Sequence, residues 1–273
     1  MTAPAMHDVA PCRLLAGTRP LLVSIPHTGT HLPPTLAARL TDEALSLPDT
    51  DWHVDRLYDF AASLGASVLV ATHSRYVIDL NRPPDNRSLY PGQDTTGLCP
   101  VDTFDRAPLY RVHAPDDVEL AARRSAFYDP YHATLRGELE RLRALHPRVV
   151  LWDAHSIRSV LPRFFAGQLP DLNFGTADGA SCDARMANAM LEIAQQANRY
   201  STVLNGRFTG GHITRHYGDP AGGVHAIQLE MAQRIYMDER HPFDYDAARA
   251  ARLQPLLRAL LEDALRHVES GSD

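Results

Sequence analysis

The chain contains 273 residues, of which 44% are hydrophobic and 22% are charged, and these proportions are typical of a soluble globular protein. Its formal net charge of -6 disfavours nucleic acid or an anionic membrane as the main partner. The sequence contains no apolar run of about 18 residues, so we expect no membrane-spanning helix. The N-terminus lacks the basic and apolar regions of a signal peptide, so we expect a cytoplasmic protein.

The cysteines indicate a reducing environment. Cys12, Cys99 and Cys182 are scattered and odd in number, and no Cys-x-x-Cys pair is present. This pattern excludes a disulfide framework and a cysteine-rich zinc site. The 14 histidines are more informative, because several of them stand beside the ends of predicted strands.

Apolar runs alternate with helical patterns along the chain. In chain order, the patterns predict a strand at 21–25, a helix at 51–65, strands at 67–72 and 75–80, a helix at 115–146, a strand at 148–154, a helix at 181–198, strands at 201–208 and 224–231, and a helix at 244–268. Strands that alternate with helices favour a mostly parallel sheet covered on both faces. We therefore predict a single α/β domain over residues 1–273, built as a three-layer sandwich.

Reactive side chains follow or end four of the apolar runs. They are His27, the group Asp79, Asn81 and Arg82, the group Asp153, His155 and Arg158, and Glu230. Ligand sites in open α/β sheets lie at the carboxyl ends of the strands, so these side chains are candidates for one common site.

Two of these histidines are candidate metal ligands. A catalytic zinc site takes three protein ligands, usually histidines with one carboxylate, and leaves a fourth position open. His27 and His155 each follow or end an apolar run, and either Asp51 or Asp55 is a candidate for the carboxylate. Each histidine taken alone is more simply a solvated loop residue, and it is the combination with the acids that favours a metal.

Glu230 and Asp153 each allow two interpretations. Burial would raise the pKa of Glu230 and suit it to proton transfer, but the same residue could be a first-turn acid of a helix that begins at 230. Asp153 either orients His155 or merely ends the strand.

Arginines form a second candidate group, because a guanidinium binds a carboxylate through two hydrogen bonds. Arg82, Arg158 and Arg215 are the candidates for an acidic substrate, Arg75 belongs to the same set, and His212 is a further candidate contact. Taken singly, most arginines are surface residues. No dinucleotide fingerprint, Walker loop or Gly-x-Ser-x-Gly elbow supports nucleotide binding or a serine hydrolase.

Five segments resemble the N-formylglutamate amidohydrolase (N-formylglutamate deformylase) family. They are SIPHTGTHLP, DTDWHVDRLYDFAASLGA, SRYVIDLNRPPDN, WDAHSIRS and NGRFTGGHITRHYGDPAGGVHAIQLEMAQRIYM, and they run in order from about residue 20 to 240. The resemblance implies a phosphorylase/hydrolase-like fold related to zinc carboxypeptidases. It also implies the hydrolysis of N-formyl-L-glutamate to formate and L-glutamate, the last step of one bacterial route of histidine degradation.

The resemblance further implies roles for individual residues. His27, His155 and an acid, for which we prefer Asp51 over Asp55, would hold one Zn²⁺ ion. Glu230 would be the general base, and the pair Asn81-Arg82 would bind a substrate carboxylate. The expected partner is a small anionic N-acyl amino acid. Co, Mn or Fe could occupy the same ligands, and no expectation follows for the oligomeric state.

Two other functions stay open at this point. One is a zinc amidohydrolase of another N-acyl amino acid, similar to a desuccinylase or an aspartoacylase. The other is a metal-binding or amino-acid-binding protein without catalysis.

Overall fold

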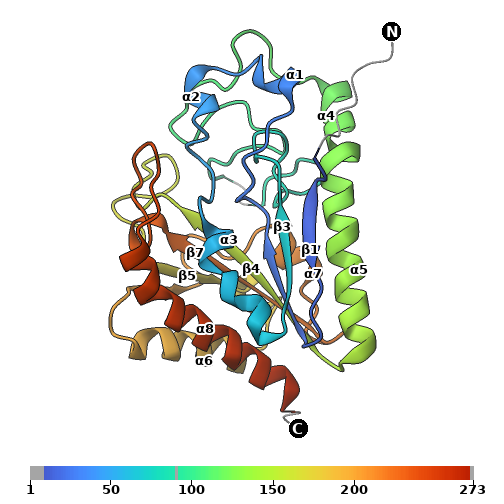
Figure 1. Cartoon of the computed structure of the whole chain (residues 1–273), viewed down its shortest axis with the longest axis vertical. Helices are drawn as coiled ribbons and strands as arrows, with labels where there is room; N and C mark the ends of the chain where they lie inside the picture. Colours follow the sequence, from blue (N-terminus) through green and yellow to red (C-terminus); the bar gives the residue numbers. More distant parts are fainter. Residues whose placement is uncertain (1–8, 90–91, 271–273) are drawn as a thin grey trace.

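The computed structural model describes residues 9–89 and 92–270, which build a seven-stranded mixed sheet with helices on both faces (Figure 1). The strands lie in the order β1-β3-β2-β4-β7-β5-β6. Their bounds are Cys12–Leu15 (β1), Leu21–Ile25 (β2), Ser67–Ala71 (β3), Val149–Ile157 (β4), Leu172–Gly175 (β5), Thr202–Leu204 (β6) and Val224–Ala232 (β7). The pairs β1–β3 and β5–β7 are antiparallel and the other pairs are parallel. The predicted three-layer α/β sandwich with a mostly parallel sheet is confirmed.

Helices cover the two faces of the sheet. The helices are α1 (Pro34–Ala37), α2 (Asp42–Leu45), α3 (Val54–Leu57), α4 (Asp117–Arg123), α5 (Asp129–Leu145), α6 (Ala184–Gln196), α7 (His212–Tyr217) and α8 (Ala247–Glu269). Shorter turns are η1 (Asp59–Leu64), the π-helical turn η2 (Arg124–Tyr128), η3 (Ala177–Gly179) and η4 (Gln233–Ile235). Helix α5 packs on one face, whereas α3, α6 and α8 pack on the other (Figure 1).

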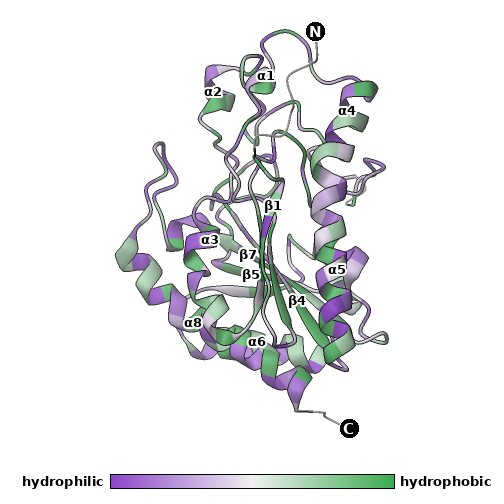
Figure 2. Cartoon of the chain, turned by 45° about the vertical axis from the view of Figure 1, so that its right-hand side comes forward, coloured by the Kyte–Doolittle hydropathy of each residue, from purple (hydrophilic) through white to green (hydrophobic). Residues whose placement is uncertain are grey.

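Strand β4 forms the centre of the hydrophobic core. All nine of its residues are buried, because β4 lies between β2 and β7 with helices on both faces. Alternate side chains point to opposite faces, so Leu151 packs with α5 and Trp152 packs with α8. Figure 2 shows the hydrophobic colour along β4, β5 and β7, whereas α5 and α8 carry polar residues as well. The central strands therefore form a rigid base for polar side chains at their carboxyl ends.

Several predicted elements are confirmed to within a few residues. The strands predicted at 21–25 and 224–231 are β2 and β7, and the C-terminal helix is α8. The helix predicted at 181–198 is α6, and the side chain of Asp183 caps it by accepting a hydrogen bond from the Arg185 amide. The strand predicted at 148–154 is β4, which continues to Ile157.

The strand predicted at 75–80 is wrong. This segment is a buried turn, in which the amide of Val77 donates to the Ser74 carbonyl at 2.8 Å. Strand β3 already pairs with β2 on one side and with β1 on the other, so no position in the sheet remains beside it. The four-residue strands β1 and β5 were not predicted, because runs this short carry too few alternating residues to be recognised.

Other predicted elements are shorter or divided. The helix at 51–65 consists of α3 and η1 and ends at Gly65, whose φ of 76° is left-handed. The helix at 115–146 consists of α4, η2 and α5. The strand at 201–208 is limited to β6, and the segment 209–223 contains α7 rather than only loop.

Four expectations concern the whole chain rather than its elements. The division into a single domain stays a prediction. Among residues 9–89 and 92–270, no helix is both long and apolar enough to cross a membrane. The first eight residues, which bear on the expected absence of a signal peptide, lie outside the described residues. Cys12, Cys99 and Cys182 are free thiols, as expected.

Gly29 fixes the path of the loop that follows β2. A Cβ atom on Gly29 would lie 2.4 Å from the carbonyl oxygen of His73 and 2.5 Å from the carbonyl carbon of Thr72, both of which are backbone atoms. The His31 amide donates to the Thr72 carbonyl at 3.0 Å in the same place. The loop that begins at His27 therefore lies against the backbone that follows β3, and only glycine allows this approach.

We expect the substitution G29A to destabilise the protein by about 1–3 kcal/mol, because the added methyl group must push two backbone segments apart. Gly137 provides a matched control, since it lies within α5 and a Cβ there would meet nothing within 4 Å. The substitution G137A should stabilise the protein by about 0.5–1 kcal/mol. Urea denaturation of both variants measures the difference, and equal effects would contradict the close approach at Gly29.

Candidate metal centre and active site

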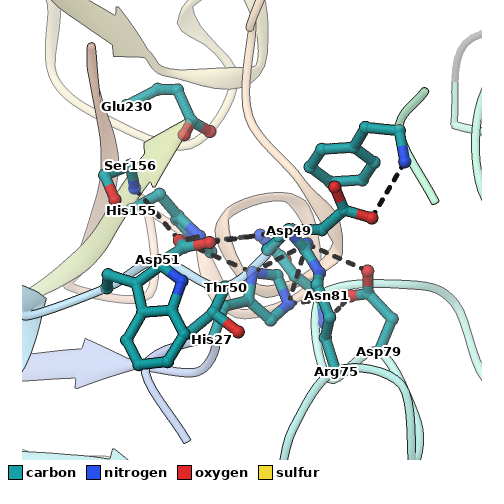
Figure 3. A network of polar contacts seen from close by, with 12 residues as sticks. His27, Asp49, Thr50, Asp51, Arg75, Asp79, Asn81, His155, Ser156 and Glu230 are labelled. Carbon is teal, nitrogen blue, oxygen red and sulfur yellow. Dashed lines mark hydrogen bonds and ion pairs between the residues drawn. The ribbon is translucent and has the colours of Figure 1, made fainter. Parts of the chain in front are cut away.

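Three buried side chains from separate segments meet at the carboxyl ends of the central strands. His27 follows β2, Asp51 precedes α3, and His155 lies within β4. One potential ligand atom from each lies within 4.8 Å of the other two, and no other group of three such residues was found in the described part of the chain. Figure 3 shows the Asp51 carboxylate beside the imidazole rings of His155 and His27. The arrangement fits a site for one metal ion.

Backbone and side-chain hydrogen bonds bring Asp51 against the two rings. Its amide donates to the His27 carbonyl at 3.1 Å, and its Oδ2 accepts from the Ser156 amide of β4 at 3.0 Å. The same Oδ2 lies 3.2 Å from Nδ1 of His155 and 3.8 Å from Nδ1 of His27. Both histidines therefore direct Nδ1 towards the carboxylate.

Two further acids hold the opposite nitrogens of the rings. Nε2 of His27 lies 2.9 Å from Oδ1 of Asp79, and Nε2 of His155 lies 3.1 Å from Oδ2 of Asp153. Carboxylates commonly accept a hydrogen bond from the second nitrogen of a metal-binding histidine and thereby fix its orientation. Two imidazole nitrogens and a carboxylate oxygen are a donor set that suits zinc. The residues present therefore fit a divalent metal ion.

Asp79 is a contributor that the sequence analysis left without a role. Asp79 lies within the segment that was wrongly predicted as a strand at 75–80, and functions were assigned only to Asn81 and Arg82, which follow this segment. The turn found there directs its carboxylate to His27 and lets the Asn81 amide donate to Oδ1 of Asp79 at 2.9 Å.

Arg75 lies against the ligand cluster rather than on the surface. Its NH2 lies 3.0 Å from Nδ1 of His27 and 3.1 Å from Oδ2 of Asp79, and its NH1 lies 3.5 Å from Oδ1 of Asp51. Only 8% of Arg75 is exposed. A buried guanidinium is stabilised by such acids, and here it balances part of their negative charge.

The electrostatics of the cluster favour ionised acids and a positive charge between them. Burial alone would raise the pKa of Asp51, but hydrogen bonds with His155 and His27 lower it below its ordinary value. Burial would likewise raise the pKa of Asp79, but the charges of His27 and Arg75 lower it. Burial disfavours the charged form of His155, yet the facing Asp153 and Asp51 raise its pKa well above 6.5. The cluster thus attracts cations.

Glu230 lies beside His155 on the neighbouring strand. The two residues are directly paired in the parallel register of β4 and β7, and Figure 3 shows the Glu230 carboxylate turned towards His155 and Asp51. Burial raises the pKa of Glu230 to about 8, although the charge of His155 opposes the shift. Strand β7 continues to Ala232, so the alternative that Glu230 begins a helix is wrong. The position suits a residue that gains and loses a proton near neutral pH.

A pocket of about 600 Å³, counted to its open mouth, lies over these residues. Its lining includes the three ligand candidates, Glu230, Arg75, Asp79, Asn81, Arg82, Phe104, Phe164, Arg207, Phe208 and Gln228. Asn81 reaches the cluster directly, since its Nδ2 lies 3.0 Å from Nε2 of His155. The predicted pair Asn81-Arg82 is therefore placed at the cavity.

The structure places four of the predicted site residues elsewhere. Asp55 lies in α3 and accepts from the Thr28 hydroxyl at 3.1 Å, because the helix begins at Val54 and Asp51 precedes it. Arg158 follows the end of β4 and is three residues from His155. Because successive side chains of a strand point to opposite faces, the odd spacing directs Arg158 away from the face of His155, and it pairs with Asp105 at 2.7 Å.

The other two, His212 and Arg215, lie on α7, outside the lining of the pocket. The His212 ring stacks on that of His216, with centroids 4.9 Å apart. Arg215 donates from Nε to the Gly210 carbonyl at 2.9 Å. No helix or strand was predicted between residues 208 and 224, and the helix found there turns both side chains to these contacts.

Arg207, Phe164 and Phe208 line the pocket but were not predicted. Arg207 belongs to the strand predicted at 201–208. Its position as a charged residue near the end of that run is the only feature of the sequence that could have indicated a role. Nothing in the sequence shows that the loop after β6 lines the same pocket as the candidate metal ligands.

Fold and cluster together define a candidate metal-dependent α/β hydrolase. A family model described as N-formylglutamate amidohydrolase matches residues 19–237, and the chain belongs to this family. It is 52% identical over 250 residues to an N-formylglutamate deformylase of Pseudomonas putida, covering 91% of this chain and 93% of the relative. It is 53% identical to a protein of the same name from Pseudomonas aeruginosa, covering 91% and 94%.

Solved structures agree with this assignment. The crystal structure of N-formylglutamate amidohydrolase from Ralstonia eutropha JMP134 superposes with a TM-score of 0.83 at 25% identity, covering 97% of this chain and 100% of that one. A gene product of Agrobacterium tumefaciens shares the fold with a TM-score of 0.73 at 22% identity, covering 96% and 97%. The fold is therefore that of the family, and the relation to zinc carboxypeptidases stays a prediction.

The raised pKa of Glu230 makes the stability of the chelator-treated protein depend on pH. The pKa rises from 4.5 to about 8 on folding, so the folded state binds more protons than the unfolded state between these values. The contribution of Glu230 to stability is then fully present below pH 4.5 and is lost as the pH rises to about 8. The variant E230Q lacks this loss, so its melting temperature should exceed that of the wild type by several °C at pH 8.

Differential scanning calorimetry across this pH range measures the effect. The advantage of E230Q should shrink as the pH falls towards 5. A difference that does not change with pH would show that Glu230 keeps an ordinary pKa.

Proposed function

We propose that the chain is a zinc-dependent amidohydrolase that hydrolyses N-formyl-L-glutamate to formate and L-glutamate. The observation that carries the proposal is the cluster of His27, Asp51 and His155 in the pocket of a chain whose relatives, 52% and 53% identical, are named N-formylglutamate deformylase. The pocket also contains an acid for proton transfer and arginines for an anionic substrate.

In this proposal His27, Asp51 and His155 hold the metal ion through two imidazole nitrogens and one carboxylate oxygen. When bound, the ion would polarise the formyl carbonyl and lower the pKa of a water ligand towards about 7. Asp79 and Asp153 keep the two rings in position by accepting hydrogen bonds from their opposite nitrogens.

Glu230 moves the proton. As a carboxylate it accepts a proton from the attacking water, and it then delivers this proton to the nitrogen of the departing L-glutamate. A group whose pKa is near the working pH can do both, and burial raises the pKa of Glu230 to about 8. Breakage of the C–N bond then yields formic acid and the neutral amine, and transfer of the acid's proton to the amine gives formate and the ammonium form of L-glutamate.

The pair Asn81-Arg82 binds the α-carboxylate of the substrate. Asn81 touches His155, so a group bound there stays close to the scissile amide, which is attached to the same carbon atom as the α-carboxylate. Arg75, held against the ligands, is the cation in position to help stabilise the oxyanion. We further propose that the reaction serves histidine degradation.

Replacement of Glu230 should separate catalysis from metal binding. We expect E230Q to lose on the order of 10²–10⁴-fold in turnover, because the proton-transfer group is removed while the metal ligands remain. We expect H155A to lose the metal itself. Metal content measured by mass spectrometry and formate release measured enzymatically provide the two readouts.

The matched control is E140Q, which removes an exposed acid of α5 and should change neither readout. Near-normal turnover by E230Q would refute the assigned role, and full metal content in H155A would refute the ligand set.

Substrate identity is tested with a panel of N-formyl, N-acetyl and N-succinyl derivatives of glutamate and aspartate, each with and without chelator. We expect N-formyl-L-glutamate to have the highest kcat/KM and the chelator to abolish its hydrolysis. A higher kcat/KM for a succinyl or acetyl derivative would favour another N-acyl amino acid amidohydrolase. A protein that binds one metal ion and hydrolyses nothing in the panel would favour a binding protein.

A further inference from the structure

We infer that Arg207 binds the side-chain carboxylate of the substrate and thereby selects N-acyl amino acids with an acidic side chain. The inference rests on the proposed function, since it assigns a second group of the proposed substrate. It replaces Arg158 and Arg215, which the sequence analysis expected in this role and which lie outside the lining of the pocket.

A row of contacts leads from the ligand cluster of His27, Asp51 and His155 to Arg207. The guanidinium of Arg75 lies 5.0 Å from the ring centroid of Phe104, and the rings of Phe104 and Phe164 are 5.1 Å apart. Nε of Arg207 donates to the Phe164 carbonyl at 2.6 Å. All four residues line the pocket, and the row runs from the cluster through the rings of Phe104 and Phe164 to the backbone carbonyl that Arg207 contacts.

This separation matches the shape of a glutamate derivative. The α-carboxylate is attached to the carbon atom that carries the scissile amide, whereas the side-chain carboxylate is two methylene groups further away. The rings of Phe104, Phe164 and Phe208 supply apolar surface for the methylene groups. Arg207, beyond these rings, is placed to meet the distant carboxylate.

The other two arginines of the pocket are less suited to this carboxylate. Arg75 is buried and held by Asp51, Asp79 and His27. Nε of Arg82 lies 3.9 Å from Oδ2 of Asp79, the acid that holds His27, so Arg82 lies beside the ligand cluster, where the α-carboxylate is proposed to bind.

The loop that carries Arg207 is held in place on both sides. The Asn205 side chain accepts from the Thr176 amide at 2.9 Å and donates to the Thr176 hydroxyl at 2.8 Å. Further along, Arg215 donates to the Thr209 hydroxyl at 2.7 Å and to the Gly210 carbonyl. Arg215 therefore supports the loop instead of touching the substrate, and the support reduces the ordering cost when a carboxylate binds.

The guanidinium of Arg207 is oriented as well as placed. The hydrogen bond from Nε to the Phe164 carbonyl fixes the guanidinium, whose Cζ lies 5.3 Å from the centroid of the Phe208 ring. A guanidinium held in this way can engage a carboxylate through two parallel hydrogen bonds. The acid on this wall, Asp94, is paired with Arg163 at 3.1 Å and with Arg106, so its charge is balanced by other residues.

The experiment compares N-formyl-L-glutamate with N-formyl-L-glutamine, which has nearly the same shape but a neutral side chain. We expect R207M to lower kcat/KM for the glutamate derivative about 10- to 100-fold, as the loss of hydrogen bonds to a charged group implies, and to change the glutamine derivative little. R207K keeps the positive charge but lacks the paired N–H donors of a guanidinium, so it should recover part of the preference for the glutamate derivative.

The matched control is R158M, which removes a nearby arginine that does not line the pocket and should leave the ratio of the two substrates unchanged. An equal loss on both substrates in R207M would show that Arg207 only supports the loop at Phe164. If R207M keeps both its activity and the wild-type ratio of kcat/KM for the two substrates, the side-chain carboxylate binds elsewhere. Either result overturns the inference.

Failure of the proposed function gives a different result. If the wild type prefers another acyl group, kcat/KM is measured for the glutamate and glutamine derivatives that carry that acyl group. The effect of R207M on the ratio of these two values then tests the role of Arg207. If nothing is hydrolysed, calorimetric binding of L-glutamate and L-glutamine to wild type and R207M provides the ratio. Equal binding of the two ligands by the wild type would then overturn the inference.

Discussion

The site depends on one buried interaction, the placement of the Asp51 carboxylate against two neighbouring imidazole rings. Its Oδ2 accepts a hydrogen bond from the backbone of β4 and faces Nδ1 of His155 and of His27. A carboxylate that is 1% exposed is stable only if positive charge or donors surround it. Arg75 and the histidines meet this need in part, and a divalent cation would meet it fully. The burial of Asp51 thus links the fold to the proposed metal-binding function.

Much of the arrangement follows from patterns in the sequence. Apolar runs that end in His27, His155 and Glu230 indicated strands whose carboxyl ends carry chemistry, and the parallel pairing of β2, β4 and β7 brings them together. The choice between Asp51 and Asp55 required the structure. The two acids lie one turn apart only if the helix includes both, and α3 begins after Asp51.

What the sequence did not predict lies in irregular segments. The segment 75–80 has the composition of a strand, but both positions beside β3 are occupied by β1 and β2, and its turn directs Asp79 to His27. Local patterns cannot contain this information, because it depends on which strands occupy the neighbouring positions. The arginines show the same limit. The direction of Arg158 depends on how far β4 extends, and the position of Arg207 depends on how the loop after β6 folds back over the pocket.

The most direct test of the account is a metal titration of the chelator-treated protein, with formate release from N-formyl-L-glutamate measured at each addition of Zn²⁺. If His27, Asp51 and His155 form a single catalytic site, activity should rise linearly with added zinc and stop rising at one ion per chain. Full activity in the metal-free protein would contradict the central claim, as would a rise that continues well beyond one equivalent.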